Sequence, residues 1–349
     1  MSIHRTQRNW GCRVHEYQWY GLDAVTLENE RIRVSFLVGK GTDLVEFNYK
    51  ARDLDFAWLA PGGIRNPHDL VAPHRDGVGP FIESYPGGWQ EIFPSAGAPA
   101  EWAGATYGQH GEAFGLPWDM TIVEDSEERV AVRFTLRGVK TPCTIEKTVA
   151  LESGKQMLSI KESLTNQAPV PFEAMWGHHI TFGAPFLVPG CKIRLPDGIA
   201  ARPHGDAVEA GARRVGSPDP FAWPNGTGID GDTVDFSIVP ESGTSSELFY
   251  LSGFGDTGSY EIMRPDVGTG MRVHWDAKTL PYLWYWQEFG GTQSWPWWGR
   301  NFNIGLEPNS SYPTSGLPEA VANGSALTLR PGETKTLWLE ATILDGSSK

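Results

Sequence analysis

The 349-residue sequence predicts an all-β fold of many antiparallel strands. Apolar and polar residues alternate with period two in several segments, which places one face of each strand on a core. Turn residues separate these segments. No helical pattern of 12 or more residues is present, and 41 Gly and 26 Pro disfavour long helices. The alternating segments are 31–36, 129–136, 144–151, 157–164, 271–275 and 334–343.

The chain is expected to form one domain over residues 1–349, because β-sandwiches commonly exceed 200 residues as a single unit. An N-terminal arm is expected at 1–22. Two segments, 60–88 and 185–235, break the strand pattern and are rich in Pro and Gly, yet they carry apolar and aromatic residues. Long ordered loops of this kind usually contribute to a functional site.

Composition excludes several functions. A net charge of −13 with no basic run argues against binding to nucleic acid. No apolar run reaches about 18 residues, so no membrane span is expected. The N-terminus lacks an apolar run of signal-peptide length. Cys12, Cys143 and Cys191 lie far apart and form no metal-type pair, which favours a reducing cytoplasm. The sequence carries no signal of oligomeric state.

The segment 281–313 is unusually aromatic, since five of the fifteen Trp residues fall between Trp284 and Trp298. Flat rings interleaved with polar side chains suit a sugar, which is apolar on its C–H face and polar at its rim. Trp286 and Trp297 are the candidates for stacking on the sugar, and Gln287 and Arg300 for binding its hydroxyls. A Trp-rich core or a protein-binding surface is the alternative interpretation.

Three further clusters carry residues suited to proton transfer. His110 lies among small residues, in a region that also offers Trp89, Gln90 and Glu112 as substrate contacts. His178 and His179 are adjacent on a strand, so one is expected to face a pocket while the other packs behind it. His178 is a further candidate for a substrate contact. Glu307 ends an apolar strand near aromatic residues, where a raised pKa would suit a base.

The order of these motifs resembles the aldose 1-epimerase (galactose mutarotase-like) family over roughly residues 25 to 343. The resemblance implies a large twisted antiparallel β-sandwich, often called a supersandwich, with a cleft across one concave sheet. It also implies His179 as general acid, Glu307 as general base, His110 as the ligand of the ring oxygen, and no cofactor. The motifs are His110-Gly111 followed by Pro117-Trp118, Trp176-Gly177-x-His179-x-x-Phe182, and Leu306-Glu307-Pro308.

Two departures from the family pattern concern cations. The family often has an Arg shortly after its first His-Gly, where this chain has Glu112-Ala113-Phe114. It also often has an Arg after the turn that here reads Phe93 to Gly97 and continues with Ala98. The missing cations suggest a ligand other than the usual hexose and argue against a phosphosugar. Arg300 is the candidate for a replacement positive charge.

The predicted function is interconversion of the α and β anomers of a free sugar in the cytoplasm. One alternative is a metal-dependent isomerase or lyase acting on a keto-sugar, in which His110, Glu112 and His179 ligate a divalent metal such as Zn, Mn or Fe. In this alternative His178 could replace His179, and Glu307 could join the ligands. The other alternative is a non-catalytic sugar-binding protein on the same scaffold.

Overall fold

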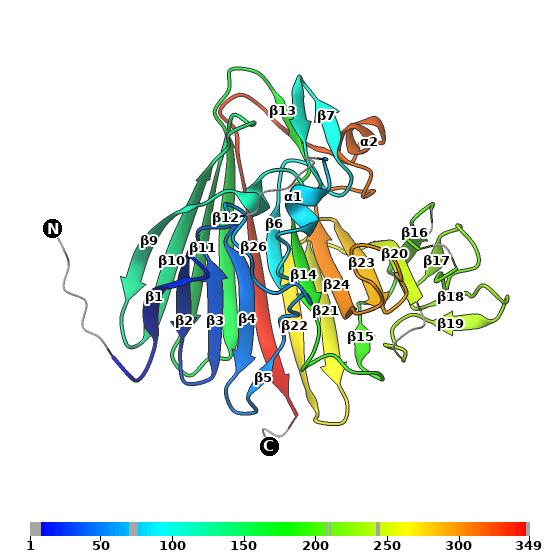
Figure 1. The fold of residues 1–349 in the computed structure, drawn as a ribbon, viewed down its shortest axis with the longest axis horizontal. Helices are drawn as coiled ribbons and strands as arrows, with labels where there is room; N and C mark the ends of the chain where they lie inside the picture. The colour runs from blue at the N-terminus through cyan, green and yellow to red at the C-terminus, as the bar shows by residue number, and fades with distance from the viewer. Residues whose placement is uncertain (1–7, 70–75, 207, 210, 242–244, 347–349) are drawn as a thin grey trace.

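The computed structural model describes residues 8–69, 76–206, 208–209, 211–241 and 245–346. Two large antiparallel sheets lie one behind the other in these residues, as Figure 1 shows. Every segment predicted from alternation forms a strand, so the all-β prediction is confirmed. The two α-helices, α1 (Gly79–Ile82) and α2 (Leu317–Ala322), are short. Neither approaches the length needed to cross a membrane, and no other described helix does so.

The first sheet has twelve strands in the order β1-β2-β3-β4-β6-β14-β24-β23-β20-β16-β17, with β5 paired to β4. Its strands are β1 (Arg13–Trp19), β2 (Leu22–Glu28), β3 (Ile32–Leu37), β4 (Asp43–Tyr49), β5 (Leu54–Asp55), β6 (Trp89–Ile92), β14 (Gly177–Phe182), β16 (Ala200–Pro203), β17 (Phe221–Ala222), β20 (Ser245–Ser252), β23 (Tyr282–Phe289) and β24 (Phe302–Asn309).

The second sheet has eight strands in the order β15-β21-β22-β26-β12-β11-β10-β9. Its strands are β9 (Asp119–Asp125), β10 (Arg129–Arg137), β11 (Cys143–Glu152), β12 (Met157–Asn166), β15 (Lys192–Arg194), β21 (Thr257–Arg264), β22 (Thr269–Asp276) and β26 (Thr334–Asp345). The remaining strands form three small two-stranded sheets: β7 (Ala100–Trp102) with β8 (Ala105–Tyr107), β13 (Phe172–Ala174) with β25 (Leu327–Leu329), and β18 (Asn225–Thr227) with β19 (Thr233–Asp235).

The main hydrophobic core lies between the two large sheets. Phe36 of the twelve-stranded sheet packs on Phe134 of the eight-stranded sheet with ring centroids 5.5 Å apart, and Phe182 meets Tyr260 at 6.2 Å. We call the face of the twelve-stranded sheet that turns toward this core its inner face, and the opposite face its outer face. Because side chains alternate along a strand, successive residues on one strand reach different environments.

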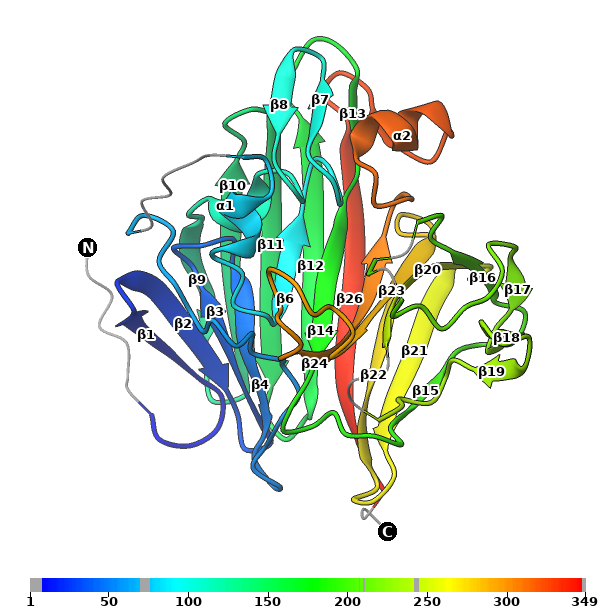
Figure 2. The same ribbon diagram turned by 45° about the vertical axis from the view of Figure 1, so that its right-hand side comes forward.

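Three predicted segments differ in detail from the structure. Within the arm 1–22, residues 1–7 lie outside the described residues, but β1 pairs along its whole length with β2, so the arm is an edge strand. The segment 185–235 is not a continuous loop, because it contains the short strands from β15 to β19 (Figure 2). The segment 60–88 includes residues 70–75, which lie outside the described residues, and it contains α1.

Candidate active site

The centre of the twelve-stranded sheet brings an imidazole and a carboxyl group together. Strand β14 pairs with β24 through Gly177 opposite Asn309 and Thr181 opposite Gly305, so His179 lies opposite Glu307 on the outer face. Nε2 of His179 is 3.7 Å from Oε1 of Glu307. Two residues separated by 128 positions in the chain therefore form a close pair.

A pocket of about 340 Å³ opens above this pair. Its walls come from α1 and the residues around it, from β20, β23 and β24, and from the segment between β23 and β24, which crosses in front of the sheet in Figure 2. The lining residues are Val78, Phe81, Ile82, Tyr85, Gln109, His110, His179, His204, Val208, Leu248, Trp284, Trp286, Trp295, Pro296, Trp297, Glu307 and Thr314.

Aromatic rings surround the imidazole of His179. The ring centroid of Tyr85 lies 5.3 Å from it and that of Trp286 lies 5.6 Å away, both with edge-to-face geometry. Trp297 continues the wall at 6.2 Å from Trp286. A sugar entering the pocket would therefore meet apolar faces on its sides and the acid–base pair at its base.

Burial sets the protonation of the central pair. Glu307 is 2 % exposed, and burial raises the pKa of its carboxyl group well above the ordinary value of 4.5. Burial also lowers the pKa of His179 to about 3. Without a ligand, the pair therefore favours a carboxylic acid beside a neutral imidazole.

A chain of hydrogen bonds fixes the tautomer of His179. The Thr181 hydroxyl donates to the carbonyl oxygen of Gly88 at 2.6 Å, and the Tyr85 hydroxyl donates to Thr181 at 3.5 Å. Tyr85 must then accept from Nδ1 of His179, at 3.3 Å. This arrangement puts the proton of the neutral ring on Nδ1 and turns the lone pair of Nε2 toward Glu307.

His110 presents its other ring nitrogen to the pocket. The backbone N–H of Gly97 donates to Nδ1 of His110 at 3.1 Å, so the neutral ring carries its proton on Nε2. Burial, reinforced by His179, lowers the pKa of His110 well below 6.5 and keeps it neutral. His110 has φ +60°, and Gly111 follows at φ +83° with no room for a Cβ, which would lie 2.3 Å from the carbonyl oxygen of Phe93.

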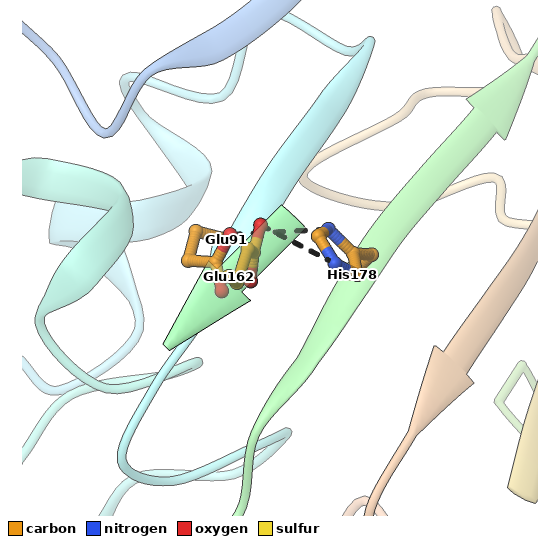
Figure 3. A group of neighbouring side chains, drawn as sticks. All are labelled: Glu91, Glu162 and His178. Atoms are coloured by element: carbon orange, nitrogen blue, oxygen red, sulfur yellow. Dashed lines mark ion pairs between the residues drawn. The ribbon is translucent and has the colours of Figure 1, made fainter. Parts of the chain in front are cut away.

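The inner face of β14 carries a different cluster, shown in Figure 3. Nδ1 of His178 lies 3.8 Å from Oε2 of Glu91 on β6, and Nε2 lies 3.6 Å from Oε1 of Glu162 on β12. Lys147 on β11 contacts Glu91 at 3.1 Å, and the indole N–H of Trp176 donates to the other oxygen of Glu91 at 2.7 Å. All these side chains are buried between the sheets.

Charge in this inner cluster balances internally. Burial alone would raise the pKa of Glu91, but Lys147 and His178 bring it below its ordinary value. Burial and then the charge of Glu91 raise the pKa of Glu162, while burial lowers the pKa of His178 to about 4. One carboxylate and one ammonium remain, so the cluster is neutral with Glu162 protonated.

The inner cluster is the one group among the described residues that brings three potential metal ligands together, in Glu91, Glu162 and His178. These residue types could ligate a divalent cation. However, Lys147 already neutralises Glu91, so a divalent cation would leave excess buried positive charge.

The metal-ligand set of the alternative prediction does not assemble. Glu112 does not line the pocket that contains His110 and His179. Its carboxylate accepts hydrogen bonds from the backbone N–H of Lys140 at 2.9 Å and from the hydroxyl of Thr141 at 2.9 Å. The prediction of a centre formed by His110, Glu112 and His179 was therefore wrong.

Five of the predicted site residues line the pocket and six do not. Those in the pocket are His110, His179, Trp286, Trp297 and Glu307; those outside it are Trp89, Gln90, Glu112, His178, Gln287 and Arg300.

Trp89 and Gln287 belong to the interior, so their predicted roles as sugar contacts do not fit their positions. Trp89 packs on Phe47 with ring centroids 5.6 Å apart. The side-chain oxygen of Gln287 accepts from Arg214 at 3.2 Å and from the hydroxyl of Tyr285 at 3.2 Å. These contacts leave Gln287 occupied on the inner face.

Gln90 and Arg300 are also displaced from the pocket. Gln90 lies opposite His179 in the sheet, but it is buried and donates to the carbonyl oxygen of Gly87. Arg300 is exposed, and its Nε donates to the carbonyl oxygen of Trp297 at 3.4 Å. The structure therefore does not place Arg300 as a replacement cation, and the described lining of the pocket contains no Arg or Lys.

Several pocket residues were not singled out from the sequence. Phe81 and Tyr85 lie in the 60–88 segment, and His204 lies in the 185–235 segment. Both segments were expected to contribute to a site, but no local pattern distinguished these residues from their neighbours. Trp284 could have been found, because it is two residues before Trp286 and therefore shares its face.

Comparison of the sequence with known proteins gives a family match without an assigned function. Residues 20–222 match a family described as "Domain of unknown function (DUF4432)". No curated protein matches the sequence.

Solved structures of low sequence identity share the fold over nearly the whole chain. A "putative aldose 1-epimerase" from Klebsiella pneumoniae has a TM-score of 0.73 at 17 % identity, covering 97 % of this chain and 88 % of that one. A galactose mutarotase-like protein from Clostridium acetobutylicum has a TM-score of 0.65 at 15 % identity, covering 96 % and 99 %. The predicted galactose mutarotase-like β-sandwich is thereby confirmed as the fold.

Proposed function

We propose that this protein interconverts the anomers of a free sugar. The chain belongs to the DUF4432 family, because that family matches more than half of its length. The observation that carries the proposal is the 3.7 Å approach of His179 and Glu307 at the base of an aromatic pocket. The galactose mutarotase-like fold adds support, although fold alone does not assign chemistry.

The proposed reaction uses one proton shared by the pair. The Glu307 carboxylate takes the proton from O1–H, the O1–H bonding electrons form C1=O1, and the C1–O5 bond breaks. Its electron pair goes to O5, which takes a proton from the imidazolium of His179. After rotation about C1–C2, O5–H returns its proton to His179 and adds to the other face of C1, while the carbonyl oxygen regains a proton from Glu307.

The proton count of the buried pair fits this cycle. A Glu307 carboxylate with a His179 imidazolium holds as many protons as a Glu307 carboxylic acid with a neutral His179. Burial favours the second arrangement, which is the resting state of the pair and its state after ring opening. Each cycle therefore begins when the Glu307 carboxyl group passes its proton to Nε2 of His179. His110 would donate from Nε2 to the ring oxygen or a neighbouring hydroxyl, since its Nδ1 is already occupied by Gly97.

The substrate is proposed to be an uncharged sugar. The described lining is mainly aromatic and aliphatic, and its polar groups are His, Gln, Thr, Tyr, Trp and the one carboxyl of Glu307. A phosphosugar would bring two negative charges to a buried carboxyl group with no cation in this lining to compensate.

Polarimetry on freshly dissolved pure anomers of a sugar panel tests the proposal. The wild type should accelerate the optical change for at least one sugar, and Glu307→Gln should slow it by about 10²–10⁴-fold, the usual contribution of one proton-transfer group. Glu146→Gln is the matched control, because Glu146 is exposed on β11 in the other sheet.

Two results would contradict the proposal in different ways. A Glu307→Gln protein with the wild-type rate would remove Glu307 from the role of base. A wild type that binds sugars in saturation-transfer NMR but accelerates none of them would instead identify a sugar-binding protein.

A further inference from the structure

A second pocket of about 320 Å³ lies beside the active pocket. Residues at the ends of β16, β20 and β23 line it. Strands β16 and β20 lie on the right in Figure 2. The residues that matter for its chemistry are Arg202, Tyr250, Ser252, Phe254, Tyr282 and Tyr312. No reaction step described above uses this pocket.

A single row of cross-strand neighbours connects the two pockets. Arg202 on β16 lies opposite Tyr250 on β20, Tyr250 lies opposite Trp284 on β23, and Trp284 lies opposite Glu307 on β24. Directly opposed residues in antiparallel strands share one face. Three strand spacings of about 4.8 Å place Arg202 roughly 14 Å from Glu307 along this row, farther than one sugar ring extends.

The wall between the pockets is one side chain thick. The hydroxyl of Tyr250 lies 2.8 Å from Nδ1 of His204, and it accepts the backbone N–H of Thr314 at 2.9 Å. His204 and Thr314 both line the active pocket, whereas Tyr250 lines the second one. A ligand bound at Glu307 could therefore continue over this wall without leaving the outer face.

The second pocket has the composition of a sugar site. The rings of Tyr282 and Tyr312 lie 4.8 Å apart, and Tyr312 is 5.7 Å from Tyr250, so three aromatic faces converge. Arg202 is exposed, and its guanidinium makes no hydrogen bond or ion pair with any residue that the structure describes. Aromatic faces with an unengaged multi-donor cation suit a ring that carries several hydroxyl groups.

We propose that the second pocket binds the next sugar ring of a reducing disaccharide or longer oligosaccharide, whose free anomeric carbon lies between His179 and Glu307. This inference rests on the proposed function for the reducing end. It adds a substrate class, namely sugars with a second ring linked to the reducing unit, and it assigns Arg202 and Tyr282 to that second ring.

Matched sugars test the proposal by kinetics. One series is D-glucose against maltose, cellobiose and lactose, which all end in reducing glucose; the other is D-galactose against galactobiose. We expect a wild-type kcat/KM higher by roughly 3- to 10-fold for at least one disaccharide than for its monosaccharide, the range that one aromatic contact supplies. Arg202→Gln and Tyr282→Ala should each reduce this preference while leaving the monosaccharide rate within about 2-fold.

Arg330→Gln is the matched control, because Arg330 is an exposed arginine on the turn after β25 and lines neither pocket. A wild type without preference for any disaccharide would overturn the second site while leaving the proposed function intact. So would a preference that Arg202→Gln and Tyr282→Ala both retain.

Saturation-transfer NMR on the same sugars separates this proposal from the proposed function. Signals from both rings of a bound disaccharide in the wild type, with the second ring lost in Arg202→Gln, would support the second site even in a protein that accelerates no anomer exchange. Signals from the reducing ring alone, or from neither ring, would overturn it.

Discussion

His178 and His179 are consecutive residues on β14, and each lies within 4 Å of a buried carboxyl group. They differ in what else surrounds the carboxyl group. On the inner face, Lys147 and Trp176 hold Glu91 ionised between the sheets. On the outer face, Glu307 has no Lys or Arg beside it among the described residues and opens to a pocket.

This difference separates a structural cluster from a reactive one. A carboxylate with a permanent cationic partner is held in one state, because removing either charge is costly. A carboxyl group without such a partner can gain or lose a proton when a ligand arrives. Perturbed pKa values occur on both faces, so only the accessible and unpaired group is a candidate for catalysis.

The sharpest test exchanges each histidine for glutamine. We expect His179→Gln to lower the rate of anomer exchange by about 10²–10⁴-fold, because the proton donor to O5 is lost. His178→Gln should leave the rate within a few-fold but lower the free energy of unfolding by about 1–3 kcal/mol, since buried polar contacts change. Polarimetry and urea denaturation measure the two effects, and equal rate losses in both variants would contradict the distinction.

Removing the cation of the inner cluster should mainly affect folding. Lys147→Met would leave Glu91 ionised and buried without its partner, so the free energy of unfolding should fall by about 3–5 kcal/mol at neutral pH. Because the pKa of Glu91 is lowered in the folded protein, its stabilising contribution exists above the unfolded value of 4.5 and is lost as the pH falls through the folded pKa. The decrease in free energy of unfolding caused by Lys147→Met should therefore become smaller toward acid pH.

Urea denaturation at several pH values measures this effect. Lys161→Met is the control, because Lys161 is exposed on β12. A Lys147→Met protein as stable as the control would show that the inner cluster does not depend on this charge.

Trp297 and Trp298 give a smaller test at the mouth of the pocket. Trp297 lines the pocket, whereas Trp298 is 58 % exposed and does not. Trp297→Ala should raise KM about 2- to 10-fold through the loss of one aromatic contact, and Trp298→Ala should leave KM unchanged. Equal effects on KM would remove the stacking role from Trp297.

The pH dependence of stability should have opposite sign on the two faces. The folded pKa of Glu307 is raised, so the folded state binds this proton more tightly than the unfolded state does. The wild type should therefore lose stability relative to Glu307→Gln as the pH rises from about 4.5 through the folded pKa. If the difference in free energy of unfolding between the wild type and Glu307→Gln stayed constant with pH, the raised pKa of Glu307 would be contradicted.

Alternation along the strands accounts for both the success and the failure of sequence-based prediction. Period two identified the strands and predicted that His178 and His179 would face opposite ways. It could not tell which residue of each adjacent pair would face the pocket, so Trp286 was placed correctly and Gln287 was not. The phase depends on packing against the other sheet, which no local pattern records.

Residues from the connecting segments were harder to predict for a different reason. Tyr85 and His204 reach the pocket because their segments fold back over the outer face, and this path depends on contacts distant in sequence. Glu112 lies two residues after His110, a spacing at which two residues of one strand would share a face, and the prediction of a shared site depended on that spacing. In the structure the chain turns at His110 and Gly111, so the alternation expected of a strand does not apply.

The turn at His110 and Gly111 has a consequence for protein engineering. The imidazole reaches the cleft only because the next residue occupies a backbone shape and a volume that no side chain tolerates. Grafting the histidine onto another scaffold without its glycine would reproduce the imidazole but not its orientation. A graft of this histidine must therefore carry at least the glycine that follows it and a backbone donor in the place of Gly97.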